Sequence, residues 1–367
     1  MTSHLRPGHP RRLLAVFAAG ALIVIAVNVT MIEPAAADGN PERPTAIVAM
    51  GDSLSAGEGG GRYEPDSNEF GRYCHRSPAA EINHAKPHGV TTAVNLACSA
   101  ATTDDISLGG TSRYGEPPQA EQLKTVARTH NVRSIVLTVG ANDIPTVVMT
   151  VECILAYLSG GSCGPRWAQQ LPQRLRAIQP RVVDNLNDIR TVMRSAGYAD
   201  NSYDLIVQSY PSPSGGLSRY SATARALNGC PFHDDDIAWF HQVGFPMITE
   251  YLRQAAASVR GVRFLGLTTA LEGRQVCTPG ISHDQEWMWG TFVDLSGLRT
   301  GPGPHLFSQS LHPNAVGYKQ LAWCLREFHA STAKTAHCAR DADGRMGLGR
   351  SCQRGRPCGV SEVSVGL

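Results

Sequence analysis

The stretch TAIVAMGDSLSAGEG, residues 45–59, decides the fold. Its first six residues form a short apolar run, which predicts a strand buried on both faces of a sheet. An aspartate, a serine and several glycines follow, so the strand ends in a polar turn. Ser53 could be a nucleophile at the strand end, or it could only cap the next helix. The rest of the chain has to separate these two alternatives.

Four further short runs rich in β-branched residues resemble the first one. They are residues 91–96, 134–139, 204–209 and 262–267. Between them, apolar residues recur at helical spacing over residues 120–129, 167–196 and 245–259. Strands that alternate with helices predict a three-layer α/β domain with a parallel sheet. Sites in such sheets form at the carboxyl ends of the strands, which is where Ser53 would lie.

The length of 367 residues fits one large domain with appendages. Basic residues, an apolar run and a small-residue site at Ala35–Ala37 predict a signal peptide over residues 1–37. A retained membrane anchor is the alternative, because the apolar run continues weakly toward Ile32. We expect the main domain over residues 38–340 and an irregular tail rich in Gly and Arg over residues 341–367.

The formal net charge is +2, and it falls to about zero once the signal peptide is removed. Nucleic-acid binding needs a basic excess on one face, so no nucleic-acid partner is expected. We predict a secreted monomer without a membrane span after signal cleavage.

The chain contains ten cysteines, and an even number in an exported protein predicts disulfides. The sequence leaves the pairing open, and pairing of neighbours along the chain is the simplest hypothesis. The pairs would be Cys74–Cys98, Cys153–Cys163, Cys230–Cys277, Cys324–Cys338 and Cys352–Cys358. A metal site is disfavoured, because the chain has no C-x-x-C motif and no close Cys/His set.

Polar residues follow the strand runs at four places, and together they fit acyl transfer by a serine. Such chemistry needs a hydroxyl, a base beside it and N–H donors for the oxyanion. Ser53 can supply the hydroxyl, His312 the base and Asn142 a side-chain donor. The backbone N–H groups of Ser53 and Ala100 could complete the oxyanion hole. Each residue alone could serve a turn, a cap or a surface loop, but their order and their position at strand ends favour catalysis.

On these residues the chain resembles the SGNH, or GDSL, hydrolase superfamily, and within it the exported actinobacterial lipase/esterase branch. Ser53 lies in a GDSL block, Asn142 in a G-x-N-D block and His312 in the last block. The segments RYCHRS (72–77) and NLACS (95–99) also resemble this branch. The resemblance implies a flavodoxin-like α/β/α fold with a five-stranded parallel sheet and no cofactor. It also implies three of the disulfides, Cys74–Cys98, Cys153–Cys163 and Cys230–Cys277.

Two positions depart from the family pattern. Ala100 stands where the family usually has glycine, so a backbone donor survives but a positive φ would be strained. Gln309 stands three residues before His312, where the family usually has aspartate. By resemblance to members that lack this carboxylate, the carbonyl of Gln309 or Ser310 would orient His312. The side-chain oxygen of Gln309 is another candidate.

The sequence therefore predicts a secreted lipase or esterase that cleaves acyl esters or lipids. Phospholipase A and polysaccharide O-deacetylase are alternatives of the same fold, and a non-catalytic binding protein on a degenerate hydrolase fold is another. An elongated apolar groove beside Ser53 would favour lipids, whereas an open polar cleft with exposed aromatics would favour glycans. Nucleotide binding is disfavoured, because no strand leads into G-x-G-x-x-G or a P-loop.

Overall fold

The computed structural model describes residues 43–69, 71–291 and 308–349. The chain divides into two compact units, Met1–Ala35 and Ala36–Leu367, and all described residues belong to the second. The expected signal peptide and the Cys352–Cys358 pair lie outside the described residues. Within these ranges we find no helix whose length and hydropathy would let it cross a bilayer.

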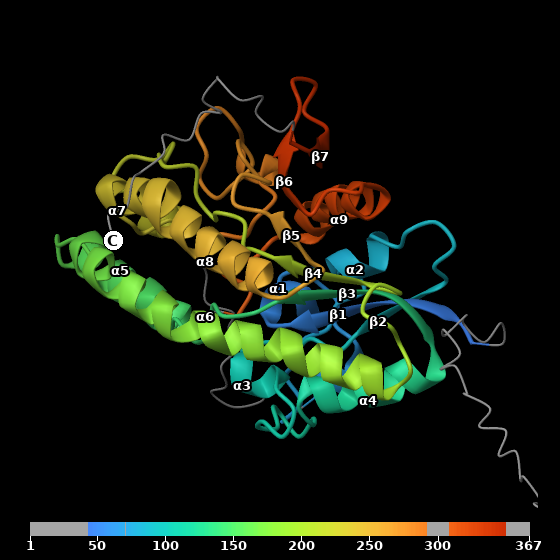
Figure 1. Cartoon of the computed structure of the whole chain (residues 1–367). Coiled ribbons are helices and arrows are strands. Elements are labelled where there is room, and N and C mark those ends of the chain that lie inside the picture. The colour runs from blue at the N-terminus through green and yellow to red at the C-terminus, as the bar shows by residue number, and fades with distance from the viewer. Residues whose placement is uncertain (1–42, 70, 292–307, 350–367) are drawn as a thin grey trace, which may run out of the picture. The chain divides into compact units, whose positions relative to one another are not determined.

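One mixed sheet of seven strands forms the centre of the described unit (Figure 1). The strands are β1 (Thr45–Gly51), β2 (Thr92–Asn95), β3 (Asn131–Thr138), β4 (Asp204–Gln208), β5 (Val262–Gly266), β6 (Thr335–Arg340) and β7 (Met346–Leu348). Their order is β2-β1-β3-β4-β5-β6-β7. All neighbours pair in parallel except β6 and β7, which are antiparallel. The first five strands follow the flavodoxin-like order that the resemblance implied.

The predicted number of five strands is wrong, because β6 and β7 extend the sheet past β5. Neither strand contains a long apolar run, and most of their residues are only partly buried. They form a hairpin at the sheet edge, which the disulfide Cys324–Cys338 ties to the preceding helix. These edge strands form through hydrogen bonds to a neighbouring strand and not through a buried apolar run, so the search for apolar runs in the sequence did not predict them. β7 lies inside the range that was expected to be an irregular tail.

Helices cover both faces of this sheet (Figure 1). They are α1 (Ser53–Ala56), α2 (Glu81–His84), α3 (Thr103–Ile106), α4 (Gln119–Thr129), α5 (Thr146–Leu158), α6 (Gly164–Ser195), α7 (Asp234–Trp239), α8 (Phe245–Ser258) and α9 (Ala315–Ala330). Short 3₁₀ turns lie at Pro65–Ser67, Ala226–Asn228 and His283–Gln285, and a π-helical turn at Phe240–Gly244 joins α7 to α8. α4, α6 and α8 pack side by side, and α2 packs on α9.

The core lies on both sides of the central strands, as the apolar runs predicted. All but the first residue of β1 are buried, and so are seven of the eight residues of β3. The parallel neighbours of these two strands bring their carboxyl ends to one edge of the sheet. The segments that follow β1, β2, β3 and β4 therefore meet at this edge.

Four disulfides join neighbouring cysteines in the described part of the chain. They are Cys74–Cys98, Cys153–Cys163, Cys230–Cys277 and Cys324–Cys338, and each agrees with the neighbour hypothesis. Such a density of bridges is typical of proteins from oxidising compartments.

A buried carboxyl group on α2 makes the stability of the fold depend on pH. Glu81 accepts a hydrogen bond of 2.8 Å from the side-chain amide of Gln208, at the end of β4. Burial raises the pKa of Glu81 from 4.5 to about 7. Between these two values the unfolded chain is ionised at this residue while the folded chain holds the proton. Stability from this group is therefore fully present below pH 4.5 and is lost as the pH rises to about 7.

We predict that Glu81→Gln cancels this loss, because glutamine keeps an acceptor for Gln208 and carries no charge. The variant should gain about 3 kcal/mol over the wild type between pH 4.5 and pH 7. Urea unfolding at pH 5, 6, 7 and 8 measures this difference. Glu121→Gln is the control, since Glu121 forms a surface ion pair with Lys124. A pH-independent difference between Glu81→Gln and the wild type would contradict the prediction.

Candidate active site

Ser53 stands at the first position of α1, and only Asp52 separates it from the end of β1. The turn requires glycine at position 51, where φ is +134° and a Cβ would lie 2.0 Å from the carbonyl oxygen of Thr138. Asp52 caps the short helix by accepting a hydrogen bond of 3.1 Å from the backbone N–H of Leu54. The N–H groups of a first helical turn have no partner within the helix, so the turn presents donors beside the Ser53 hydroxyl.

The imidazole of His312 lies against this hydroxyl, although 259 positions separate the two residues. Nε2 of His312 is 2.8 Å from Oγ of Ser53, and Nδ1 is 3.0 Å from the backbone carbonyl oxygen of Ser310. A carbonyl oxygen can only accept, so Nδ1 carries the proton and Nε2 is left as an acceptor. The ring is therefore in the tautomer that can take a proton from Ser53.

Of the candidate partners for Nδ1, the structure brings only Ser310 to the ring. The carbonyl oxygen of Gln309 instead accepts the backbone N–H of His312, at 3.2 Å. Leu311 adopts a positive φ of 61°, which turns the chain between Ser310 and His312. Burial lowers the pKa of His312, and the negative charge of Glu58 and the Ser310 carbonyl only partly offset this.

Ala100 and Asn142 line the same cavity as Ser53 and His312. The side-chain amide of Asn142 donates one hydrogen bond of 2.9 Å to the carbonyl oxygen of Ala101, which holds it beside the loop after β2. An amide carries two N–H donors, so this bond still leaves one for a ligand. The three residues expected to supply donors therefore line one cavity, although they follow three different strands.

Two buried side chains near Ser53 were not among the sequence candidates. Tyr210 follows β4 and donates a short hydrogen bond to the carboxyl group of Asp52, while it accepts the backbone N–H of Ala141 at 3.1 Å. Burial and the charge of Asp143 raise the pKa of Asp52 to about 7, against the hydrogen bonds it accepts. The position of Tyr210 just after a predicted strand was the only sequence signal for it.

Glu58 is the second such residue, and its side chain is fully buried beside the site. It follows Ser53 by five positions and lies within the glycine-rich stretch with which the sequence analysis began. A glutamate between glycines has no helical or strand pattern of its own, so the sequence offered no reason to place it inside.

The cavity that opens beside Ser53 and His312 has a volume of about 470 Å³. Its lining includes residues of α5, of α7, of the π-helical turn after α7 and of α8, together with residues of the loops after the strands. Most of the lining is apolar and includes Met149, Ile154, Phe232, Ile237, Phe240 and Ile248. An engineered apolar cavity of about 150 Å³ holds benzene. This space is roughly three times as large, so it has room for an apolar group larger than benzene.

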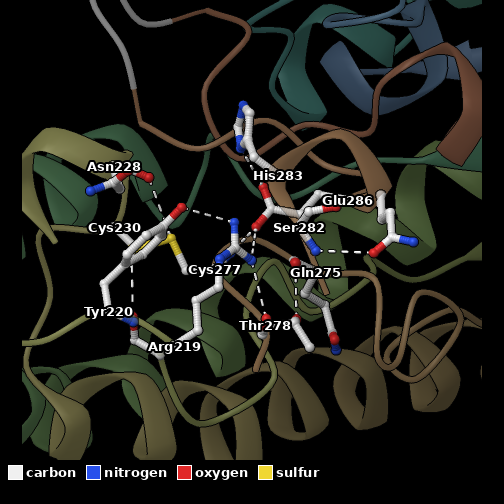
Figure 2. Close-up of polar contacts among 12 residues, drawn as sticks. Arg219, Tyr220, Asn228, Cys230, Gln275, Cys277, Thr278, Ser282, His283 and Glu286 are labelled. Carbon is white, nitrogen blue, oxygen red and sulfur yellow. Dashed lines mark hydrogen bonds and ion pairs between the residues drawn. A yellow bond between two sulfur atoms is a disulfide. The ribbon is translucent and has the colours of Figure 1, made fainter. Parts of the chain in front are cut away.

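A buried ion pair lies beside a disulfide whose two cysteines line the cavity (Figure 2). Cys230 and Cys277 line the cavity, and their disulfide joins the two long loops that follow β4 and β5. Arg219 of the first loop lies 2.7 Å from Glu286 of the second, and the same carboxylate accepts the backbone N–H of Cys277. Since the Glu286 side chain is only 2% exposed, little solvent screens this pair.

The strain at Ala100 gives a stability prediction. Ala100 adopts a φ of +63°, which costs an L-residue about 1–2 kcal/mol and glycine nothing. Glycine loses about 0.4–1 kcal/mol through the entropy of the unfolded chain. Ala100→Gly should therefore stabilise the protein by about 0.5 kcal/mol and keep the backbone donor. Urea unfolding with intact disulfides measures this change.

Ala101→Gly is the matched control for this change. Ala101 is fully buried in the same loop and is not among the residues with positive φ. Its replacement removes a buried methyl group and adds chain entropy, so it should destabilise the protein by about 1 kcal/mol. Equal losses in both variants would show that Ala100 is not strained.

Comparison with known proteins confirms the family resemblance. The model of the GDSL-like Lipase/Acylhydrolase family matches residues 49–320, which include all four blocks of polar residues. "Lipase 1" of Streptomyces coelicolor is 30% identical over 186 residues, 48% of this chain. The match spans 59% of that relative, less than two thirds of its length.

Two solved structures are also similar to the chain. The extracellular lipase of Streptomyces rimosus is 21% identical, with a TM-score of 0.46 over 75% of this chain and 94% of that one. Phospholipase A1 of Streptomyces albidoflavus NA297 is 20% identical, with a TM-score of 0.49 over 74% of this chain and 94% of that one.

Proposed function

Because the chain belongs to the GDSL-like lipase/acylhydrolase family, we propose that it is a secreted serine hydrolase that cleaves carboxylic esters of long acyl chains. The observation that carries the proposal is the 2.8 Å contact between Nε2 of His312 and Oγ of Ser53 in the lining of a mainly apolar cavity. Nucleophile and base are already within the distance that proton transfer needs.

In the first half of the reaction, Oγ of Ser53 attacks the ester carbonyl carbon while its proton passes to Nε2 of His312. The oxyanion that forms is bound by the backbone N–H groups of Ser53 and Ala100 and by the free amide N–H of Asn142. The intermediate then collapses, the carbon–oxygen bond to the alcohol breaks, and the alcohol takes the proton from His312. An acyl group remains on Ser53.

In the second half, a water molecule attacks the acyl carbon and gives its proton to the same Nε2. The second oxyanion uses the same donors, the bond to Ser53 breaks, and Oγ recovers the proton. Throughout the cycle the Ser310 carbonyl keeps the imidazole in one orientation through Nδ1. Typical oxyanion donors contribute about 2.7–4 kcal/mol each, which makes three converging donors a substantial part of the rate.

The lining of the cavity favours a lipid-like acyl group over a glycan. A polysaccharide O-deacetylase needs room for only an acetyl group beside the serine and a polar cleft for the sugars. Here the space next to Ser53 is lined mainly by apolar side chains, several of them from α5. Four disulfides in the described part of the chain support export, together with the signal-peptide pattern of the first 37 residues.

The nucleophile is tested by Ser53→Ala with p-nitrophenyl hexanoate as substrate. Hydrolysis should fall by about 10⁴-fold or more, because no other hydroxyl lies against Nε2 of His312 in the contacts described above. The variant should keep the urea midpoint of the wild type, which separates lost chemistry from lost folding. Substantial activity in folded Ser53→Ala would rule out the serine mechanism.

The acyl preference is tested with p-nitrophenyl esters from acetyl to palmitoyl. Each methylene that enters the cavity should raise kcat/KM by up to about fourfold, since its burial is worth about 0.8 kcal/mol. Ile154→Asp should abolish this gain and leave acetyl-ester hydrolysis nearly unchanged. Leu158→Asp on the same helix is the control, because Leu158 is 64% exposed and lies outside the cavity lining. A profile that falls from acetyl onward would contradict a long-chain substrate.

A further inference from the structure

A buried carboxylate that the reaction above does not use lies next to the proposed base. The side chain of Glu58 accepts hydrogen bonds from three groups, Nδ1 of His75 at 2.7 Å, Oγ of Ser99 at 2.6 Å and the hydroxyl of Tyr63 at 2.6 Å. Burial alone would raise the pKa of Glu58, but His75 above all, with His312 and Ser99, holds it below its ordinary value. Glu58 is therefore ionised inside the protein.

The backbone around Glu58 ties it to both members of the proposed catalytic pair. Its N–H donates to the carbonyl oxygen of Ser53 at 2.9 Å. The next residue, Gly59, packs so closely on the His312 loop that a Cβ would lie 3.1 Å from Cβ of His312. The carbonyl oxygen of Gly59 accepts the indole N–H of Trp289 at 2.7 Å, and Trp289 in turn donates its backbone N–H to His312.

His312 needs a negative charge that its own loop does not supply. When Nε2 takes the serine proton, the ring becomes a cation in a site that burial makes unfavourable for charge. Nδ1 faces the neutral carbonyl of Ser310, and Gln309 occupies the position three residues earlier. A carbonyl fixes the tautomer, but it stabilises an imidazolium less than a carboxylate does.

We propose that Glu58 is the counter-charge of His312, a positioning residue that acts through space in place of the missing carboxylate before the histidine. This proposal rests on the proposed function, because it concerns the base of that reaction. Ser99 connects Glu58 to the proposed oxyanion loop, because its hydroxyl donates a hydrogen bond to Glu58 and its backbone directly precedes Ala100. One buried anion thus connects the nucleophile turn, the proposed oxyanion loop and the base.

The charge states of the other ionisable groups around Glu58 and His312 determine in which direction the pKa of His312 moves when the Glu58 charge is removed. Tyr63, Tyr114 and Tyr318 have raised pKa values and are neutral at working pH. Glu58 raises the pKa of His312, and His75 lowers it. Removal of the Glu58 charge should therefore make His312 a weaker base.

The test is the pH dependence of kcat/KM for p-nitrophenyl acetate, whose acid limb reports the pKa of the base in the free enzyme. Glu58→Gln should move this limb to lower pH by about one unit and lower the plateau kcat about tenfold, with little change in KM. Asp105→Asn is the control, because Asp105 is also buried and ion-paired, with Arg113, yet it does not act on His312. Its limb should stay at the wild-type pH. A limb of Glu58→Gln that stays in place or moves upward overturns the proposal.

A second variant tests the proposal even if Glu58→Gln does not fold. Glu58→Asp keeps a carboxylate in the same surroundings, so its acid limb should stay near the wild-type pH even if kcat falls. A limb of Glu58→Asp that moves to lower pH by about one unit, as expected only for loss of the charge, overturns the proposal. Failure of the proposed function would appear differently, as activity retained in Ser53→Ala, whatever the Glu58 profiles show.

Discussion

The close approach of β1 and β3 at Gly51 is the constraint on which the site depends. No side chain fits there, since a Cβ would lie 2.0 Å from the Thr138 carbonyl oxygen. The backbone N–H and carbonyl of Gly51 are both bound by the side-chain amide of Gln119, at 2.7 Å each. The end of β1 is therefore held on both sides, and the Asp52–Ser53 turn can leave the sheet in only one direction.

Burial and hydrogen-bond partners determine which carboxyl groups around this turn are charged. Asp52 and Glu81 are fully buried carboxyl groups without a cationic partner among the contacts described, and burial raises the pKa of each to about 7. Glu58 is equally inaccessible but is hydrogen-bonded to Nδ1 of His75 at 2.7 Å, and its pKa is lowered instead. The same chemical group is thus neutral or charged according to its partner, and the charged one lies beside the proposed base.

Much of the site could be predicted because its residues follow strand ends. Ser53, Ala100 and Asn142 each come within a few residues of the end of an apolar run, and parallel strands bring such ends to one edge. The partner of His312 could not be chosen from sequence. Gln309 and Ser310 lie in one short loop, and the positive φ of Leu311 determines which carbonyl faces Nδ1. Tyr210 and Glu58 were missed because their roles depend on contacts across the fold.

The sequence by itself determined the buried strands, their alternation with helices and the four polar blocks, because apolar runs and turn residues act locally. The pairing of neighbouring cysteines that was predicted from the sequence is also the pairing of the four described disulfides. Only the tertiary structure decided the edge hairpin of β6 and β7, the apolar cavity between α5 and α8 and the surroundings of Glu58. These features arise where segments far apart in sequence meet, and the free energy of such contacts depends on burial and distance that no local pattern records.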